Sequence, residues 1–300
     1  MTKFHGLFPA VITPMTPEGE LNETAFRKVL EFNIQAGVHG FWIAGGSGES
    51  ILIGEDENRR IAQIAVDQIR GRVGTIMHVS APTTAEAVRN AQNAARAGVD
   101  SICGLPPCFY GTGDDELVEY YRSVGQAADL PLFVYNLPEA TGVEITPELA
   151  KKIQDSVPQL VGLKHSALNF KNVWKFSQMG LQCFMGFSSL MLPALTVGAV
   201  GSVDGPPNVA PEPFVEVWEA YQAGDWKRAQ DAQDRAAHIF NLFEGEYGPY
   251  IGVLKSLLSR RLGVDCGNPR PPSLPLTEEQ ANRVWERFCE LMPTGAAVGD

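Results

Sequence analysis

The feature that most restricts the fold of this chain is a regular alternation of short β-rich runs with longer segments of helical periodicity. The runs predict eight strands, at residues 7–12, 40–44, 73–78, 101–105, 132–135, 160–164, 182–185 and 200–203. Between them apolar residues recur at helical spacing, for example at residues 24–36, 57–70, 85–97 and 116–128. Eight successive βα units predict a parallel sheet closed on itself, the (β/α)₈ or TIM barrel of the α/β class.

An open, doubly wound sheet is the main alternative to a barrel. Such a sheet normally has fewer strands and carries a G-x-G-x-x-G phosphate-binding motif after the first one, and this chain has no such motif after residues 7–12. Three predicted helices end at Gly37, Gly98 and Gly198, which is typical of a chain that turns from helix back into strand. The barrel is therefore favoured.

After the eighth predicted strand, four helical segments follow one another without a strand. They cover residues 211–223, 226–243, 250–262 and 277–291, and a proline-rich linker at residues 267–275 joins the last two. Proline favours an extended crossing between helices. We expect a barrel catalytic domain over residues 1–224 and a helical extension over residues 225–300, packed together as one structural unit, with a frayed end at residues 293–300.

The charge of the chain limits its partners. A formal net charge of −11 argues against nucleic acid or an anionic membrane surface. An anionic small-molecule substrate would have to be attracted locally, by a lysine or by backbone amides.

The cysteines and the hydropathy favour a cytoplasmic protein. The five cysteines are odd in number, scattered, and form no C-x-x-C motif, so that neither a disulfide framework nor a zinc site is indicated. No apolar stretch approaches the roughly 20 residues of a membrane span. Residues 1–15 also lack the apolar core of a secretory signal.

Lys164 is the first candidate catalytic residue, because barrel enzymes place their sites at the carboxyl ends of the strands. It ends the apolar run at residues 160–164. Strand alternation puts Lys164 and Gly162 on one face, and the glycine is expected to leave room for the lysine side chain. Inside a barrel, poor solvation favours the neutral amine, which is a nucleophile toward carbonyl carbon. The structural alternative is a lysine whose amine reaches solvent at the barrel rim.

Two other strand ends carry candidate groups. Tyr135 ends the fifth predicted strand, where a phenol could transfer protons to and from a bound carbonyl compound, or could simply belong to the core. The glycine-rich residues 45–49 follow the second strand. Such a turn lets backbone amides approach a ligand, and a helix beginning just after it would favour an anion such as a carboxylate.

In this order the motifs resemble those of the dihydrodipicolinate synthase/N-acetylneuraminate lyase family of class I pyruvate aldolases. The resemblance covers nearly the whole chain. Its motifs are GLFPAVITPM at 6–15, GGSGES at 45–50, YNLPEATG at 135–142, GLK at 162–164, GAVGSV at 198–203, and Lys255, Leu262-Gly263 and Arg270-Pro271-Pro272 in the helical tail.

The resemblance implies a role for each matching residue. Lys164 matches the lysine that forms a Schiff base with a pyruvate-type 2-oxo acid, and Tyr135 the tyrosine that donates and accepts protons. Gly46 and Ser47 match the pair that holds the carboxylate, and Val203 the residue whose backbone contacts the keto acid. The family needs neither a metal nor an organic cofactor, and its members suggest a homo-oligomer, a dimer or tetramer.

Departures from the family pattern bear on the substrate. In the synthase branch a hydroxyl residue stands at the position of Gly46, and an arginine that binds the second substrate stands at the position of Ala140. A tyrosine that a neighbouring subunit inserts into the site stands at the position of Phe109, although Tyr110 is next to it here. In the sialate-lyase branch an acidic pair for sugar hydroxyls falls at Ser188 and Ser189. These losses disfavour synthase activity most strongly.

We therefore expect aldol cleavage or dehydration of a 2-keto-3-deoxy sugar acid or a sialate-like keto acid. Dihydrodipicolinate synthase activity is an alternative, and so is a catalytically silent keto-acid-binding protein.

The sequence also suggests roles for several residues near these motifs. Alternation sends His165 to the face opposite Lys164, Glu49 is expected to brace its loop, and the role of Asp204 is left open. Four aromatic or thioether side chains are candidates either for lining the pocket or for the core: Trp42, Phe109, Met185 and Phe187.

Overall fold

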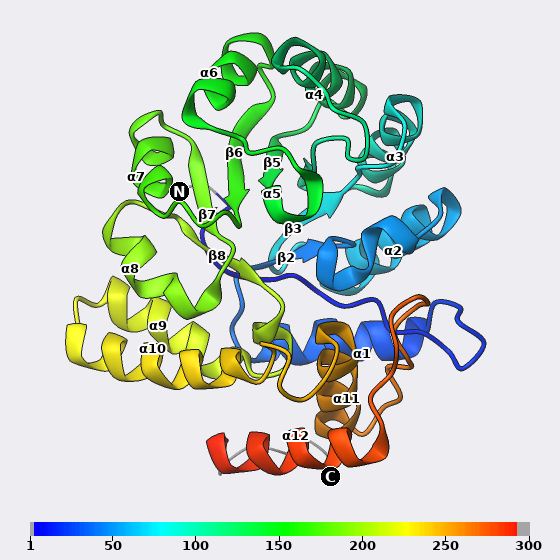
Figure 1. Ribbon diagram of the computed structural model, residues 1–300, viewed down its shortest axis with the longest axis vertical. Helices are drawn as coiled ribbons and strands as arrows, with labels where there is room; N and C mark the ends of the chain where they lie inside the picture. The colour runs from blue at the N-terminus through cyan, green and yellow to red at the C-terminus, as the bar shows by residue number, and fades with distance from the viewer. Residues whose placement is uncertain (1–2, 293–300) are drawn as a thin grey trace.

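The computed structural model describes residues 3–292 of the 300-residue chain, and its centre is a sheet of eight parallel strands (Figure 1). The strands are β1 (Gly6–Pro9), β2 (Gly40–Ile43), β3 (Gly74–His78), β4 (Ser101–Gly104), β5 (Leu132–Asn136), β6 (Leu160–His165), β7 (Gln182–Met185) and β8 (Gly201–Asp204). Each lies where the alternation predicted a strand. The (β/α)₈ barrel is confirmed.

The sheet closes into a ring. Strands adjacent in sequence are hydrogen-bonded neighbours from β2 to β8, and β8 pairs with β1. Between β1 and β2 the ring is closed by an isolated bridge, Ala10 to Trp42. Two backbone bonds support it, Val11 N–H to Trp42 O at 3.0 Å and His39 N–H to Leu7 O at 2.9 Å.

Helices surround the ring and bury the outward faces of the strands in the larger of two hydrophobic cores. They are α1 (Glu23–Gln35), α2 (Glu55–Ile69), α3 (Thr84–Ala97), α4 (Asp114–Ala128), a short α5 (Pro138–Thr141), α6 (Pro147–Ser156), α7 (Lys171–Gln178), α8 (Met191–Thr196) and α9 (Pro211–Gln222). Gly37, Gly98 and Gly198 have φ values of +91°, +87° and +100°. Glycine adopts this left-handed conformation without a Cβ clash, so these turns form as predicted.

The barrel interior is a second, smaller core made largely of aromatic rings, including Phe8, Phe133 and Phe184. Gly162 faces this core opposite Phe133. A Cβ at Gly162 would lie 2.7 Å from the Phe133 ring. It would lie closer still, 2.2 Å, to Gln182 O on β7, so the glycine accommodates both the Phe133 ring and the neighbouring backbone. That Gly162 makes room for Lys164 stays a prediction.

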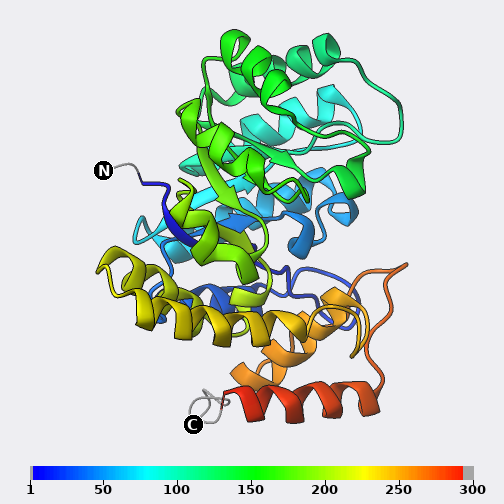
Figure 2. The same ribbon diagram turned by 60° about the vertical axis from the view of Figure 1, so that its left-hand side comes forward.

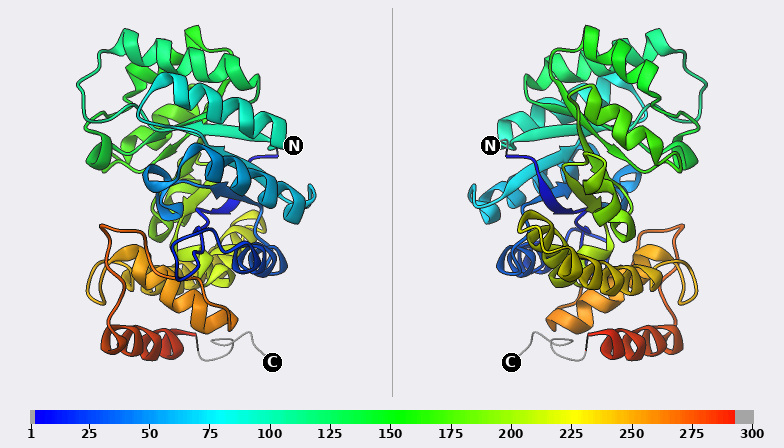
Figure 3. Two further views of the ribbon diagram at one scale, coloured as in Figure 1. Left: turned by 90° about the vertical axis from the view of Figure 1, so that its right-hand side faces the viewer. Right: turned by 90° about the vertical axis from the view of Figure 1, so that its left-hand side faces the viewer.

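Three helices follow α9, as the sequence predicted: α10 (Trp226–Asn241), α11 (Tyr250–Leu262) and α12 (Glu278–Leu291). Helix α9 itself packs on β1, and α10 packs against α9 (Figure 2). Helix α11 lies between α12 and the barrel (Figures 1 and 3). Irregular chain containing the prolines connects α11 to α12.

The proposed domain boundary between residues 224 and 225 stays a prediction. Residues 1–2 and 293–300, including the end expected to fray, lie outside the described residues. Within residues 3–292, no helix combines the length and the apolar composition that a bilayer crossing requires.

Candidate active site

Strand β6 places Lys164 at the carboxyl end of the barrel, with its side chain turned inward and only 4% of the residue exposed. The Nζ atom lies 4.3 Å from the centre of the Tyr135 ring and 5.7 Å from that of Trp42. Among the ion pairs of residues 3–292, none involves Lys164. The lysine side chain is thus buried against aromatic faces at the end of the barrel.

Tyr135 lies beside Lys164 because the two residues are register partners on β5 and β6. The tyrosine is 5% exposed, and its ring meets that of Trp42 edge-on at 5.6 Å. Its hydroxyl lies 3.8 Å from the point where a Cβ on Gly46 would stand. The end of the second strand, the fifth strand and the sixth strand therefore converge on one place, as the positions of their motifs suggested.

The glycine-rich loop after β2 forms two short 3₁₀ turns, Gly46–Gly48 and Ser50–Leu52. It leaves Gly46 exposed and Ser47 buried. Helix α2 begins only at Glu55, and its first turn contains three acidic residues. The expectation of a helix start directly after the loop that attracts an anion is wrong, since these carboxylates would repel one. Favourable contacts with an anion would come from the loop itself.

Glu49 holds the loop to the C-terminal helices. Its Oε2 accepts a 2.6 Å bond from Lys255 Nζ, and its Oε1 a 2.6 Å bond from the Arg270 backbone N–H. Lys255 also donates to Asn268 O at 3.0 Å. Burial lowers the pKa of Lys255, while the hydrogen bond and charge of Glu49 oppose that shift. Glu49 therefore braces the loop, as expected.

The ends of β7 and β8 form a further part of the site. Val203 is fully buried in the barrel interior. Asp204 Oδ2 accepts from Ser188 N–H at 2.8 Å and from the Ser188 hydroxyl at 2.9 Å. Burial raises the pKa of Asp204, against the charge of Lys164 and the bonds from Ser188 and Gly205. The carboxylate left open by the sequence thus lies within the electrostatic reach of Lys164, and Ser188 orients it.

His165 points away from the site. Its Nδ1 is 3.1 Å from Asn136 Nδ2, its Nε2 is 3.0 Å from Asn169 O, and its ring packs edge-on against Phe176 of α7. Burial lowers the pKa of His165. Its place on the helix-facing side agrees with the prediction from strand alternation.

Two residues of the site were not singled out in the sequence. Tyr250 is the first residue of α11, yet its hydroxyl lies 3.4 Å from Ser47 Oγ. His78 ends β3, and neither of its ring nitrogens has a hydrogen-bond partner among the described residues. Burial, and secondarily the charge of Lys164, lowers the pKa of His78 to about 4. His78 could have been found from its strand end, but nothing in the sequence links Tyr250 to the distant loop.

The four side chains that were candidates for lining the pocket lie in different places. Trp42 backs Lys164 and Tyr135. Phe109, on the loop between β4 and α4, is 91% exposed, so the expectation that it lines the pocket is not met within one chain. Met185 and Phe187 line a neighbouring hollow instead.

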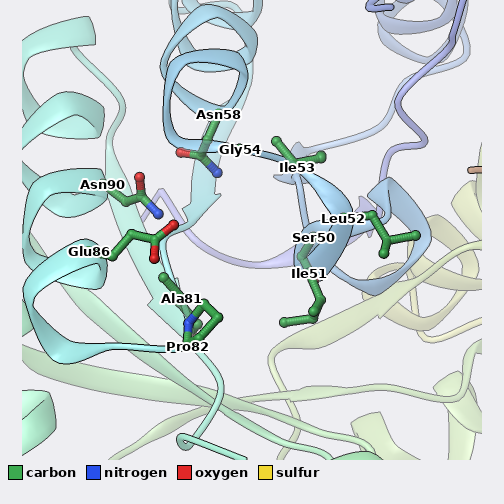
Figure 4. A pocket seen from close by; sticks show the side chains of 11 residues that line it. Ser50, Ile51, Leu52, Ile53, Gly54, Asn58, Ala81, Pro82, Glu86 and Asn90 are labelled. Atoms are coloured by element: carbon green, nitrogen blue, oxygen red, sulfur yellow. The ribbon is translucent and has the colours of Figure 1, made fainter. Parts of the chain in front are cut away.

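Two hollows flank the candidate site without including Lys164, Tyr135 or Ser47. One, of about 290 Å³, is lined by Met185, Phe187 and Phe240 among others. The other, of about 220 Å³, lies between the loop after β2 and helix α3, where Asn58, Glu86 and Asn90 border it (Figure 4). Across residues 3–292, no group of three or more His, Cys, Asp or Glu side chains is placed to hold a metal ion.

The fold and this constellation define a class of protein, a (β/α)₈ barrel enzyme with a buried lysine and phenol at the carboxyl ends of its strands. The chain belongs to the dihydrodipicolinate synthetase family, whose family model matches residues 3–288. As a member of that family it is a lyase.

Similar proteins span nearly the whole chain. Over 300 residues it is 31% identical to a 4-hydroxy-tetrahydrodipicolinate synthase of Methanopyrus kandleri, covering 98% of this chain and 99% of the relative. It is 33% identical over 292 residues to an uncharacterized DapA-like lyase of Halobacterium salinarum, covering 96% and 94%. The solved structure of YagE from E. coli K12 in complex with pyruvate superimposes with a TM-score of 0.91 at 25% identity, covering 96% and 98%.

Proposed function

We propose that this lyase forms a Schiff base between Lys164 and a pyruvate-type 2-oxo acid. The observation that carries the proposal is the buried lysine, which has no ion-pair partner among the described residues and whose Nζ lies 4.3 Å from the Tyr135 ring centre. Imine formation requires a lysine amine within reach of the bound carbonyl carbon, with a proton-transferring group beside it. The pyruvate bound in the structure of YagE supports a 2-oxo acid as ligand.

The proposed reaction begins when Lys164 Nζ attacks the keto carbon. Tyr135 protonates the departing hydroxyl, water leaves, and a protonated imine forms. Tyr135 then takes the proton of the hydroxyl on C4, the C3–C4 bond breaks, and its electron pair moves into the imine to give an enamine and a free aldehyde. Protonation at C3 and hydrolysis return pyruvate and the free amine. Such positioned proton transfers are worth about 10²–10⁴-fold in rate.

The carboxylate of the acid is proposed to lie on the loop after β2, against Gly46 and Ser47, with the Val203 backbone near the keto group. Ser47 offers a hydroxyl, and Gly46 lets the backbone approach closely. A local site of this kind suits a chain of net charge −11, whose overall field would not attract an anion.

For the aldehyde half we propose a 2-keto-3-deoxy sugar acid or a sialate-like keto acid as substrate. The Asp204 carboxylate and the Ser188 hydroxyl provide polar groups where β7 and β8 end. A carboxylate that accepts from hydroxyls suits a polyol. Synthase activity is the second candidate, favoured by the name of the M. kandleri relative, but Ala140 at the arginine position is exposed and uncharged.

A screen of 2-oxo acids for released pyruvate tests the proposal, with Lys164→Ala as the matched control. Release from at least one longer acid, lost in the control, is expected. If pyruvate forms an imine and no acid is cleaved or dehydrated, the alternative of a silent keto-acid-binding protein replaces the proposed activity.

We further propose a cytoplasmic homo-oligomer, a dimer or tetramer. Phe109 and Tyr110 are 91% and 78% exposed on one loop, an arrangement that suits burial against another subunit. The five cysteines are free, which suits a reducing compartment. Light scattering and native mass spectrometry test the oligomeric state.

A further inference from the structure

Tyr250 brings a second phenol to the candidate site from outside the barrel. It begins α11, and its ring packs edge-on against Phe243 at 5.9 Å. Its hydroxyl reaches Ser47, with 3.4 Å between the two oxygens, and either could be the donor. Usual hydroxyl pairs are closer, at about 2.7–2.8 Å, but bonds in unliganded active sites often shorten when the ligand binds.

Space for this contact is made by Gly205, which follows β8. A Cβ at Gly205 would lie 2.0 Å from the Tyr250 hydroxyl oxygen and 2.8 Å from Ser47 Oγ. The φ of Gly205 is −79°, an ordinary value for any residue, so its backbone does not require glycine. The absence of a side chain at Gly205 instead allows the two hydroxyls to meet.

The number of protons on these hydroxyls decides the direction of the bond. A serine hydroxyl has one proton to donate, and a carboxylate only accepts. If Ser47 donates to the carboxylate of a bound acid, it has no proton left for Tyr250. Tyr250 must then donate to Ser47. The protonated phenol is the form required, and burial, with Asp204 and Tyr135 nearby, raises the pKa of Tyr250 well above its usual range.

We infer that Tyr250 is a positioning residue that donates to Ser47 and so fixes the Ser47 hydroxyl as a donor to the substrate carboxylate. This inference rests on the proposed function. Chains of hydrogen bonds polarise one another, so the Tyr250 bond also strengthens the bond from Ser47 to the anion. Tyr250 is not expected to touch the reacting carbons, and its loss should weaken binding of the acid more than it slows turnover.

The test measures how much pyruvate is needed for half-maximal borohydride trapping on Lys164. Tyr250→Phe keeps the ring and removes the bond, so this concentration should rise about three- to tenfold, the worth of one net hydrogen bond. For methyl pyruvate, which lacks the carboxylate, it should change less than about twofold. Tyr221→Phe is the matched control, since it removes a remote phenol bond of 3.0 Å to Leu195 O.

A double-mutant cycle checks that Tyr250 acts through Ser47. In a Ser47→Ala background, adding Tyr250→Phe should change the half-saturating concentration less than about 1.5-fold. Gly205→Ala should separate the two hydroxyls without replacing either residue, and it should weaken binding of pyruvate more than that of methyl pyruvate. The same loss in this second variant would show that the effect of Tyr250→Phe does not come from a folding defect.

The outcomes separate this inference from the proposed function. Wild-type protein that traps no pyruvate on Lys164 overturns both. Other outcomes overturn only the inference, provided that the wild type traps pyruvate. One is that Tyr250→Phe leaves the half-saturating concentration of pyruvate unchanged, or raises that of methyl pyruvate by the same factor. Another is that Tyr250→Phe raises this concentration by the same factor in the Ser47→Ala background as in the wild type.

Discussion

Lys164 Nζ lies 4.3 Å from the centre of the Tyr135 ring, on the neighbouring strand of the barrel. The contact follows from the sheet register, which pairs the two residues directly, and from strand alternation, which turns both side chains inward. The lysine side chain is thereby largely buried with a phenol beside it, and the proposed imine chemistry rests on this arrangement.

Tyr135→Phe removes the phenol and keeps the ring beside Lys164. We expect kcat on the true substrate to fall about 10²–10⁴-fold, the typical contribution of a general acid–base group. Steady-state kinetics on the acid found by the pyruvate-release screen measure this. A rate near that of the wild type would show that another group moves the protons, and Tyr110 would be the next candidate.

With pyruvate and aspartate semialdehyde, we expect little or no synthase activity. The position of the family arginine is Ala140, and a lost charged hydrogen bond costs about 1.5–3 kcal/mol, roughly 10–100-fold in rate. Gly46 and Phe109 lack the hydroxyls that the synthase branch has there. A coupled assay should show cleavage of a longer 2-oxo acid to be measurably faster. Robust synthase turnover would mean that another cation, from this or a neighbouring subunit, replaces the arginine.

The stability of the protein should depend on pH through His78. Burial lowers its pKa in the folded protein to about 4, from an ordinary histidine value of 6.5. As the pH falls from about 6.5 to about 4, the unfolded chain binds a proton that the folded chain excludes, so the free energy of unfolding falls, by about 3 kcal/mol in all. Urea titrations across this window should give a flatter dependence for His78→Gln.

His39 supplies a comparison in the same pH window, because burial lowers its pKa to about 4 as well. His39→Gln should remove a separate contribution of the same sign, and the two should add. A pH dependence identical in wild type and His78→Gln would contradict the assignment to His78.

Lys255→Met should destabilise the protein strongly. Glu49 would keep its burial and its bond to the Arg270 backbone but would lose its only ion-pair partner among the described residues. Breaking one side of a buried pair costs about 3–5 kcal/mol, measurable as a lower urea midpoint. The double variant Glu49→Gln/Lys255→Met should recover part of the loss. A loss below about 1 kcal/mol would show that the pair does not hold the loop.

Sequence patterns predicted the parts of the molecule that depend on local periodicity. All eight strands follow from the alternation of β-rich runs with helical segments. The inward direction of Lys164 and the outward direction of His165 follow from the two-residue period of a strand. These predictions succeeded because one face of each strand is fixed by the barrel interior and the other by the helices.

The sequence patterns did not predict contacts between distant parts of the chain. The Phe133 ring and the Gln182 backbone of the two neighbouring strands fill the space beside Gly162, because strand register rather than sequence proximity decides what lies there. The loop after β2 continues into a second 3₁₀ turn before α2 begins. Tyr250 reaches Ser47 across 203 positions of sequence, a proximity that only the packing of α11 on the barrel creates.

Borohydride reduction in the presence of pyruvate tests the central claim most directly. Lys164 is the buried lysine of the site, so the peptide that contains it should gain one reduced pyruvyl group by mass spectrometry. Lys164→Ala should lose this adduct while keeping the circular dichroism spectrum of the folded wild type. An adduct on a different lysine, or none at saturating pyruvate, would contradict the covalent mechanism.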